Sequence, residues 1–403
     1  MSDTGEHLTV AVLSDMHAYA KDRDGRTDEP SHLECGMRED DPNRHPVVGL
    51  EQLIAKHSLE ADLLLCGGDL GDKADVAGLE FAWKLVERIR SKLGADQVIA
   101  TAGNHDLDSR YQHTQFSAQE ELKRLRPRFP IADTGKSTEY WGRNFTVLEG
   151  PDCRVVTLNS CAYHGQGTGE QDKGRISEYT LAELREELDG EEAPPINILL
   201  CHHHPVHFTD IGDDSYDAMD GGPGLLDLLR SGSHGRWMVI HGHRHMPHLT
   251  YALGGAASPV IFSAASFSVD LHLAIQARSR NQFYMLSFPL EETRELGLSF
   301  AGRFQSWYWV PRSGWEVTPP GLSLPPAGGF GYREDGQLIA RTIHDYMCDS
   351  PRQSMSWEDL TGEFPRLAYL IPEDIALTRL ELQALGAGVL PRQGQYLERV
   401  EFP

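Results

Sequence analysis

The chain has 403 residues, of which 40% are hydrophobic, 24% charged and 8% aromatic, a composition within the globular range and unlike that of disordered or collagen-like chains. This length is too great for one minimal domain and predicts two or three structural units. The formal charge of -23, from 60 acidic and 37 basic residues, repels polyanions and argues against nonspecific binding to extended nucleic acid.

The cysteines and the N-terminus indicate the compartment. Six cysteines stand far apart without a C-x-x-C pair, and two of them end apolar runs, so we expect reduced thiols rather than disulfides. The N-terminal segment lacks the basic region and the long apolar stretch of a signal peptide. No run approaches the roughly 18 apolar residues that a membrane-spanning helix needs. These features predict a cytoplasmic protein that does not engage a membrane.

Six short apolar runs, each ending at a polar cluster, predict β-strands that are covered on both faces. They span residues 8–14, 61–67, 97–101, 154–160, 196–202 and 237–243. The clearest helix between them covers residues 75–93, where apolar residues recur at steps of three and four and Gly94 provides a C-terminal stop. This alternation predicts an α/β fold, with functional sites on loops beyond the strand ends.

Two regions depart from this alternation. Residues 18–46 are polar, turn-rich and too long for a simple connection, which is typical of an inserted functional lid or a disordered segment. Residues 309–331 are dense in proline and glycine and predict a linker or an extended arm that wraps the core. Two short helices are expected after it, at residues 336–348 and 372–385.

We therefore divide the chain into a catalytic domain, residues 1–300, and a C-terminal accessory region, residues 301–403. Neither the inserted loop nor the accessory region carries a motif that indicates its role. The accessory region is a candidate surface for forming a homo-oligomer.

Five polar clusters directly follow the apolar runs. They are Asp15-Met16-His17, Gly68-Asp69, Gly103-Asn104-His105-Asp106, His202-His203-His204-Pro205 and Gly242-His243-Arg244-His245. Each supplies carboxylate, amide or imidazole groups of the kind that bind Mn, Fe or Zn. A single cluster of this kind arises by chance, and a lone histidine is more often a packed or surface residue. Five clusters in order at strand ends predict a metal site.

This ordered set resembles the D-x-H, G-D, G-N-H-[DE], H-x-P and G-H-x-H blocks of the calcineurin-like metallophosphoesterase superfamily, over residues 8 to about 270. The resemblance implies a four-layer α/β/β/α sandwich of two facing mixed β-sheets flanked by helices, with ligands on loops at one edge. It also implies two divalent metal ions as cofactors, with Mn, Fe or Zn as the expected metals.

The resemblance further implies which side chains hold each metal. One ion takes Asp15, His17 and His245, the other takes Asn104, His203 and His243, and Asp69 bridges them. His203 is chosen from the three consecutive histidines because the superfamily's ligand lies two residues before the proline. His202 and His204 are the competitors, expected to pack or to support the ligands by hydrogen bonds.

His105 directly follows a metal ligand, so it is expected to face the substrate rather than the same ion. In the superfamily this residue stabilises the transition state or protonates the leaving oxygen, and Asp106 would orient it and raise its pKa. Alternatively, Asp106 only caps the following turn. Arg110 and Arg244 are either phosphate clamps or solvated surface charges, and His241 is expected behind the ligands.

The predicted reaction is hydrolysis of a phosphodiester, in which a metal-bridging hydroxide attacks in line and His105 assists the leaving group. The aspartate of G-N-H-D resembles the superfamily's small phosphodiesterases. A small nucleotide or cyclic nucleotide is therefore the first expected substrate, since the acidic surface disfavours a long polyanion. Alternatives are a phosphomonoesterase acting on a nucleotide or phosphoprotein, a nuclease subunit of a larger complex, and a scaffold without catalysis, which the complete ligand set disfavours.

Overall fold

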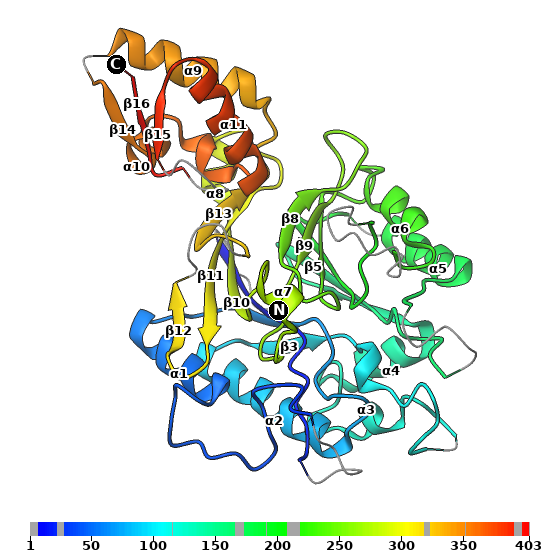
Figure 1. The fold of residues 1–403 in the computed structure, drawn as a ribbon. Helices are drawn as coiled ribbons and strands as arrows, with labels where there is room; N and C mark the ends of the chain where they lie inside the picture. The colour runs from blue at the N-terminus through cyan, green and yellow to red at the C-terminus, as the bar shows by residue number, and fades with distance from the viewer. Residues whose placement is uncertain are drawn as a thin grey trace.

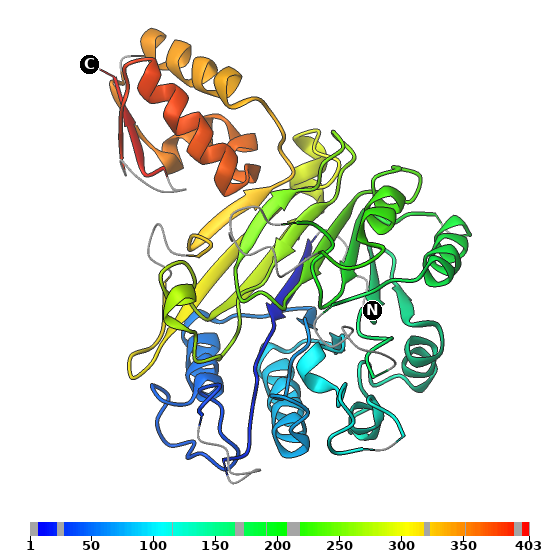
Figure 2. The same ribbon diagram turned by 45° about the vertical axis from the view of Figure 1, so that its right-hand side comes forward.

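The computed structural model describes residues 7–21, 28–114, 116–165, 173–190, 192–207, 218–317, 323–350, 352–390 and 397–402. Two large β-sheets pack face to face, and a smaller unit at the C-terminal end projects from one end of them (Figure 1, Figure 2). Among the described residues, no helix is both long enough and apolar enough to cross a lipid bilayer.

The first sheet has the strand order β12-β11-β10-β1-β2-β3, and β13 also pairs with β11. Its strands are β1 (His7–Leu13), β2 (Leu63–Cys66), β3 (Gln97–Ala100), β10 (Gln282–Pro289), β11 (Gly302–Val310), β12 (Gly314–Val317) and β13 (Ala327–Phe330). Because β1, β2 and β3 are parallel, the loops that follow them leave the sheet at the same edge.

The second sheet has the order β4-β5-β6-β7-β9-β8. Its strands are β4 (Phe145–Glu149), β5 (Cys153–Leu158), β6 (Ile196–Leu200), β7 (Trp237–His241), β8 (His248–Tyr251) and β9 (Val260–Ser263). β5, β6, β7 and β9 are mutually parallel. Each of the six apolar runs thus forms a strand, which confirms the strands predicted from hydrophobicity.

Helices cover the outer faces of both sheets. The long helices are α1 (Pro46–His57), α2 (Val76–Leu93), α4 (Thr134–Arg143), α5 (Glu178–Asp189) and α6 (Gly222–Leu229). Shorter ones are η1 (Asn104–Asp106), α3 (Glu120–Arg124), α7 (Leu273–Gln276) and α8 (Leu290–Glu295). α1 and α2 share one apolar core with the first sheet, α5 and α6 share another with the second, and a third core fills the space between the sheets. The predicted four-layer α/β/β/α sandwich is confirmed.

α2 illustrates how local sequence sets an element. The side chain of Asp75 accepts a hydrogen bond from the Gly78 N–H at the N-terminus, and Gly94 closes the C-terminus in the left-handed conformation, with φ 68°. Its buried face includes Leu79, Val86 and the other apolar positions spaced by three and four, as the sequence predicts.

The C-terminal unit has its own small core. It comprises α9 (Gly336–Asp349), β14 (Ser354–Ser356), α10 (Trp357–Glu363), η3 (Pro365–Tyr369), α11 (Pro372–Ala384), β15 (Gly388–Leu390) and β16 (Arg399–Glu401). Its three strands pair in the order β14-β16-β15. The two helices predicted at residues 336–348 and 372–385 are α9 and α11.

Residues 302–330 lie past the predicted boundary at residue 300, yet β11, β12 and β13 belong to the first sheet. The proline- and glycine-rich segment therefore supplies edge strands rather than only a linker; residues 318–322, within it, are outside the described residues. Part of the inserted loop, residues 28–45, packs on the catalytic domain, where the His32 N–H donates to Ser268 O at 2.8 Å. Residues 22–27 of the same loop are not described.

Gly78 lies where α2 passes the loop after β1, and a Cβ atom there would overlap the carbonyl oxygen of Ala18. Gly78→Ala should therefore destabilise the protein by about 1–3 kcal/mol. Gly142, exposed in α4 with open space around it, is the control, and Gly142→Ala should stabilise by up to about 1 kcal/mol. Urea unfolding measures both changes, and equal stability of the two variants would contradict the close approach.

Candidate metal centre

The five predicted clusters follow β1, β2, β3, β6 and β7 and meet at one edge of the two sheets. Backbone hydrogen bonds tie the first two loops together, because the Asp15 N–H donates to Gly68 O at 2.9 Å and the His17 N–H donates to Asp69 O at 3.0 Å. The second sheet joins them where the His243 N–H donates to the Asp15 carboxylate, at 3.1 Å from Oδ1. Residues far apart in the sequence thus face one another.

Five of the predicted ligands have left-handed backbone conformations. Their φ angles are 54° for Asp15, 48° for His17, 53° for Asp69, 77° for His243 and 55° for His245. This region costs about 1–3 kcal/mol for a residue with a side chain, and such strain persists only where the surroundings enforce it. The chain turns sharply after each strand, which brings the polar side chains to the shared edge.

The glycines of the motifs permit close approach. A Cβ atom on Gly103 would overlap both the backbone and the carboxylate of Asp69, and one on Gly242 would overlap Ser14 and Asp15. Both positions therefore require glycine because the neighbouring loops leave no space for a side chain, and not because of their own backbone φ angles.

Asp15, His17, His245 and Asp69 form a first set of donors, which we call the first cage. Asp15 Oδ1 lies 3.3 Å from His245 Nε2 and 3.9 Å from His17 Nε2, and His17 Nε2 lies 3.4 Å from Asp69 Oδ2. His17 Nε2 is buried without a hydrogen-bond partner among the described residues. An imidazole nitrogen in that position, facing two carboxylates, fits a metal ligand.

Asp69, Asn104, His202 and His243 form the second cage. Asn104 Oδ1 lies 3.0 Å from His202 Nε2 and 3.0 Å from His243 Nδ1. Asp69 Oδ2 lies 3.3 Å from His202 Nε2 and is the same oxygen that faces His17. Asp69 thus stands between both cages, as a bridging carboxylate would, and the nitrogen and oxygen donors suit two divalent cations.

The structure corrects the choice among the three histidines. His202, not the predicted His203, lies beside Asn104 and Asp69. Its Nδ1 is 2.7 Å from Gly67 O, and because a carbonyl only accepts, Nδ1 carries the hydrogen and Nε2 is left for the cage. His203 Nδ1 instead lies 2.8 Å from Ser160 Oγ. Spacing to the proline places all three residues near the site but does not decide which ring turns inward.

The structure also corrects the role of Asp106. Its carboxylate accepts backbone hydrogen bonds from Asp69 at 2.9 Å, Gly71 at 3.0 Å and Gly103 at 2.9 Å, and it makes no described contact with the His105 ring. Asp106 therefore fixes the two loops to each other, close to its predicted alternative as a cap.

Asp72, which the sequence analysis missed, takes the orienting role. Its Oδ1 lies 3.2 Å from His105 Nδ1 and 3.4 Å from His17 Nδ1, so one buried carboxylate positions both rings. The sequence did contain a signal for this residue, since Asp72 stands three residues after the predicted ligand Asp69 in the same loop.

The remaining candidates differ in exposure. Arg110 is exposed, whereas Arg244 is buried. His241 is fully buried and its Nδ1 lies 3.1 Å from Gly242 O, so it supports the loop from behind as predicted.

The pKa values of His17 and His202 rise, whereas that of the shared carboxylate Asp69 falls. Burial lowers the pKa of His202, but the charge of Asp69 outweighs it and raises this pKa to about 9. Burial also lowers the pKa of His17, but hydrogen bonds to Asp15, Asp69 and Asp72 outweigh burial and raise this pKa well above its ordinary value. Burial raises the pKa of Asp69, yet the charges of His202 and His105 hold it well below its usual range. Asp69 therefore stabilises positive charge on His17 and His202, whereas burial and the charge of His202 lower the pKa of His243 well below its ordinary value.

The comparisons with known proteins agree with this geometry. A family model described as calcineurin-like phosphoesterase matches residues 8–273, more than half of the chain. The chain belongs to the calcineurin-like phosphoesterase family. Residues 8–273 are thus a metal-dependent phosphoesterase domain, and its clusters of histidine and aspartate suit the family's two metal ions. A second model, described as wHTH-Calcineurin_assc, matches residues 328–384, so the C-terminal unit is a winged helix-turn-helix.

A solved structure shares the fold. Purple acid phosphatase PPD1 from yellow lupin (Lupinus luteus) seeds matches with a TM-score of 0.51 and 11% identity, over 82% of this chain and 55% of that one. The chain thus spans just over half the length of that enzyme. Phosphopantetheinyl hydrolase from Mycobacterium tuberculosis matches with a TM-score of 0.31 and 12% identity, over 65% of this chain and 91% of that one. No curated protein matches the chain.

Variants at the histidine triplet test the second cage. His202→Ala should lower manganese binding from two ions per chain to about one, because the loss of a ligand exceeds the roughly 10–100-fold loss in affinity expected when an outer partner is removed. His203→Gln should retain both manganese ions. Equilibrium dialysis with metal analysis measures the stoichiometry, and loss of manganese from the His203 variant alone would restore the original assignment.

The raised histidine pKa values give metal binding a pH dependence. Protons on His17 and His202 must leave when a cation binds, so the apparent affinity for manganese should rise with pH and level off near pH 9, about the pKa of His202. Calorimetry in buffers of different ionisation enthalpy measures the released protons. An affinity that does not change with pH up to that value would contradict the prediction.

Proposed function

We propose that the enzyme hydrolyses a phosphodiester bond in a small molecule, such as a nucleotide or cyclic nucleotide. The observation that carries this proposal is the placement of His105. Its side chain is 31% exposed, its ring centroid lies 4.4 Å from that of His17, and Asp72 holds its Nδ1. An alkyl phosphate ester releases an alkoxide, for which His105 can serve as the proton donor beside the cages, and a diester needs no further cation because its phosphate carries only one negative charge.

We propose that the two cages hold the metal pair. Asp15, His17 and His245 would hold one cation, Asn104, His202 and His243 the other, with Asp69 shared. Such a pair supplies positive charge to the phosphate and lowers the pKa of water. Asn104 contributes a neutral oxygen, so the centre retains positive charge for an anionic substrate.

His105 serves as the proton donor to the leaving oxygen. The ionised Asp72 carboxylate only accepts hydrogen bonds, so it accepts one from the Nδ1–H of His105 and fixes the ring's orientation. Nε2 is left to face the substrate and to give its proton to the leaving oxygen. The backbone N–H of His105 donates to Asp69 Oδ1 at 2.7 Å, which ties the donor to the carboxylate that both cages share.

Charge supports a small substrate over extended nucleic acid. The chain carries a formal charge of -23 and contains no lysine after Lys173, so the winged-helix unit has only arginines to offer to a phosphate backbone. On α11, the third helix of that unit, Glu373, Asp374 and Glu381 are acidic, and Arg379 is only 8% exposed. Such a surface repels nucleic acid.

Paired nitrophenyl substrates test the diester preference. With manganese present, kcat/KM should be higher for bis(p-nitrophenyl) phosphate than for p-nitrophenyl phosphate, and cyclic nucleotides should be cleaved. The monoester requires stabilisation of a second negative charge, and Arg244, which stands between His243 and His245 in the sequence, is buried rather than exposed as a clamp. Activity confined to the monoester would contradict the proposal and favour a phosphomonoesterase.

The leaving group tests His105. His105→Asn should lower kcat by about 10²–10⁴-fold for an alkyl ester, whose alkoxide needs a proton. The same variant should lose little activity on bis(p-nitrophenyl) phosphate, because nitrophenolate leaves without protonation. Rates measured across a series of leaving groups show whether His105 protonates the leaving oxygen. An equal loss on every substrate would show that His105 acts only on the metal site.

A further inference from the structure

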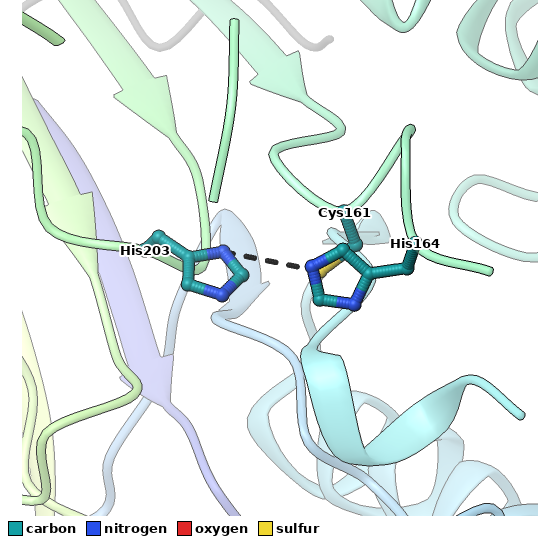
Figure 3. A group of neighbouring side chains, drawn as sticks. All are labelled: Cys161, His164 and His203. Atoms are coloured by element: carbon teal, nitrogen blue, oxygen red, sulfur yellow. Dashed lines mark hydrogen bonds between the residues drawn. The ribbon is translucent and has the colours of Figure 1, made fainter. Parts of the chain in front are cut away.

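A cysteine and two histidines gather beside the second cage, outside the two donor sets described above (Figure 3). Cys161 and His164 lie in the loop after β5, and His203 lies in the loop after β6. Their exposed fractions are 0%, 3% and 1%. Cys161 Sγ is 3.9 Å from His203 Nδ1, and one donor atom from each residue lies within 4.8 Å of the others.

We propose that Cys161, His164 and His203 form a third metal site that takes one zinc-class cation. A thiolate with two imidazoles is a donor set that selects zinc over magnesium, calcium or manganese. With Zn–S near 2.3 Å and Zn–N near 2.0–2.1 Å, tetrahedral ligands lie roughly 3.3–3.7 Å apart. The observed sulfur–nitrogen distance needs only a small adjustment to reach this range.

The surroundings can complete the coordination. Ser160 Oγ lies 2.8 Å from His203 Nδ1, and Lys173 O lies 3.0 Å from His164 Nε2, so oxygen donors stand next to the ring nitrogens. Ser109 Oγ lies 3.2 Å from His164 Nδ1 and can accept its hydrogen when Nε2 binds a cation. Three protein ligands with an oxygen in the fourth position is a common zinc arrangement.

His203 can offer Nδ1 to a cation. Its Nε2 has no hydrogen-bond partner among the described residues, so the ring hydrogen can stand on Nε2 while Nδ1, beside Cys161 Sγ, keeps its lone pair. Cys161 is protonated in this arrangement, because burial holds the pKa of its thiol well above the usual range and Sγ donates to Ala102 O at 3.2 Å. Binding forms a sulfur–zinc bond and releases that proton to solvent.

The location suggests what such an ion does. Ala102, the partner of Cys161, stands two residues before Asn104, and His203 directly follows His202. A cation bound here would cross-link the loop after β5 to the loop after β6 and brace two donors of the second cage. The third site is thus structural, and its occupancy is independent of the substrate that the enzyme hydrolyses.

Cobalt distinguishes this site from the cages, because neither cage contains sulfur. The full-length protein loaded with Co²⁺ should show a thiolate-to-cobalt charge-transfer band in the near ultraviolet, and Cys161→Ser should abolish this band while the other cobalt bands remain. Cys348 is the matched control, since its Sγ lies 3.6 Å from His344 Nε2 on exposed α9, and Cys348→Ser should keep the band. A wild-type protein without the band, or a Cys161→Ser variant that retains it, overturns the proposal.

Zinc stoichiometry provides a second measurement that does not depend on the folding of the Cys161 variant. Wild-type protein dialysed against Zn²⁺ should retain one more ion than the two cages hold, and His164→Gln should lose that ion only. Circular dichroism confirms that the His164 variant is folded. A wild-type stoichiometry of two zinc ions per chain overturns the third site and leaves the phosphodiesterase proposal untouched.

Discussion

The buried carboxylate of Asp69 is the interaction on which the rest of the centre depends. Its Oδ2 lies 3.4 Å from His17 Nε2 and 3.3 Å from His202 Nε2, while Oδ1 accepts the His105 N–H at 2.7 Å. A buried charge is costly unless it is paired and hydrogen-bonded. The left-handed turn at Asp69 and the carboxylate of Asp106 that holds its N–H therefore serve to keep one side chain between two cages.

The fold was largely predictable from the sequence because its signals are local. Each strand is a continuous apolar run, and α2 carries both its cap and its stop signal within its own segment. The orientation of side chains was not predictable in the same way. His202 and His203 are equally close to the site along the chain, and only the carbonyl of Gly67, from a different loop, turns His202 inward. Asp72 replaces Asp106 beside His105 for the same reason, since residue spacing sets proximity and not direction.

The region after residue 300 was harder to predict because its structure depends on distant partners. β11 pairs with β10, and β13 then pairs with β11, so a glycine-rich segment becomes sheet edge only when the first sheet already exists. The strands of the winged helix are three residues each, too short for a hydrophobic pattern to register. α9 and α11 were found because helix start and stop signals lie within or next to each segment, as Gly386 does after α11.

The C-terminal region also contacts β8, the strand that follows the loop carrying His243 and His245. β8 begins at His248, three residues after His245 of the first cage, and His248 Nε2 lies 3.6 Å from Glu373 Oε1 in the first turn of α11. At the other end of β8, the guanidinium of Arg333 stacks 3.8 Å from the ring centroid of Tyr251, and the Tyr251 hydroxyl accepts the Gly331 N–H. Both ends of this strand therefore contact the C-terminal region, and the strand directly follows the loop that carries His243 and His245.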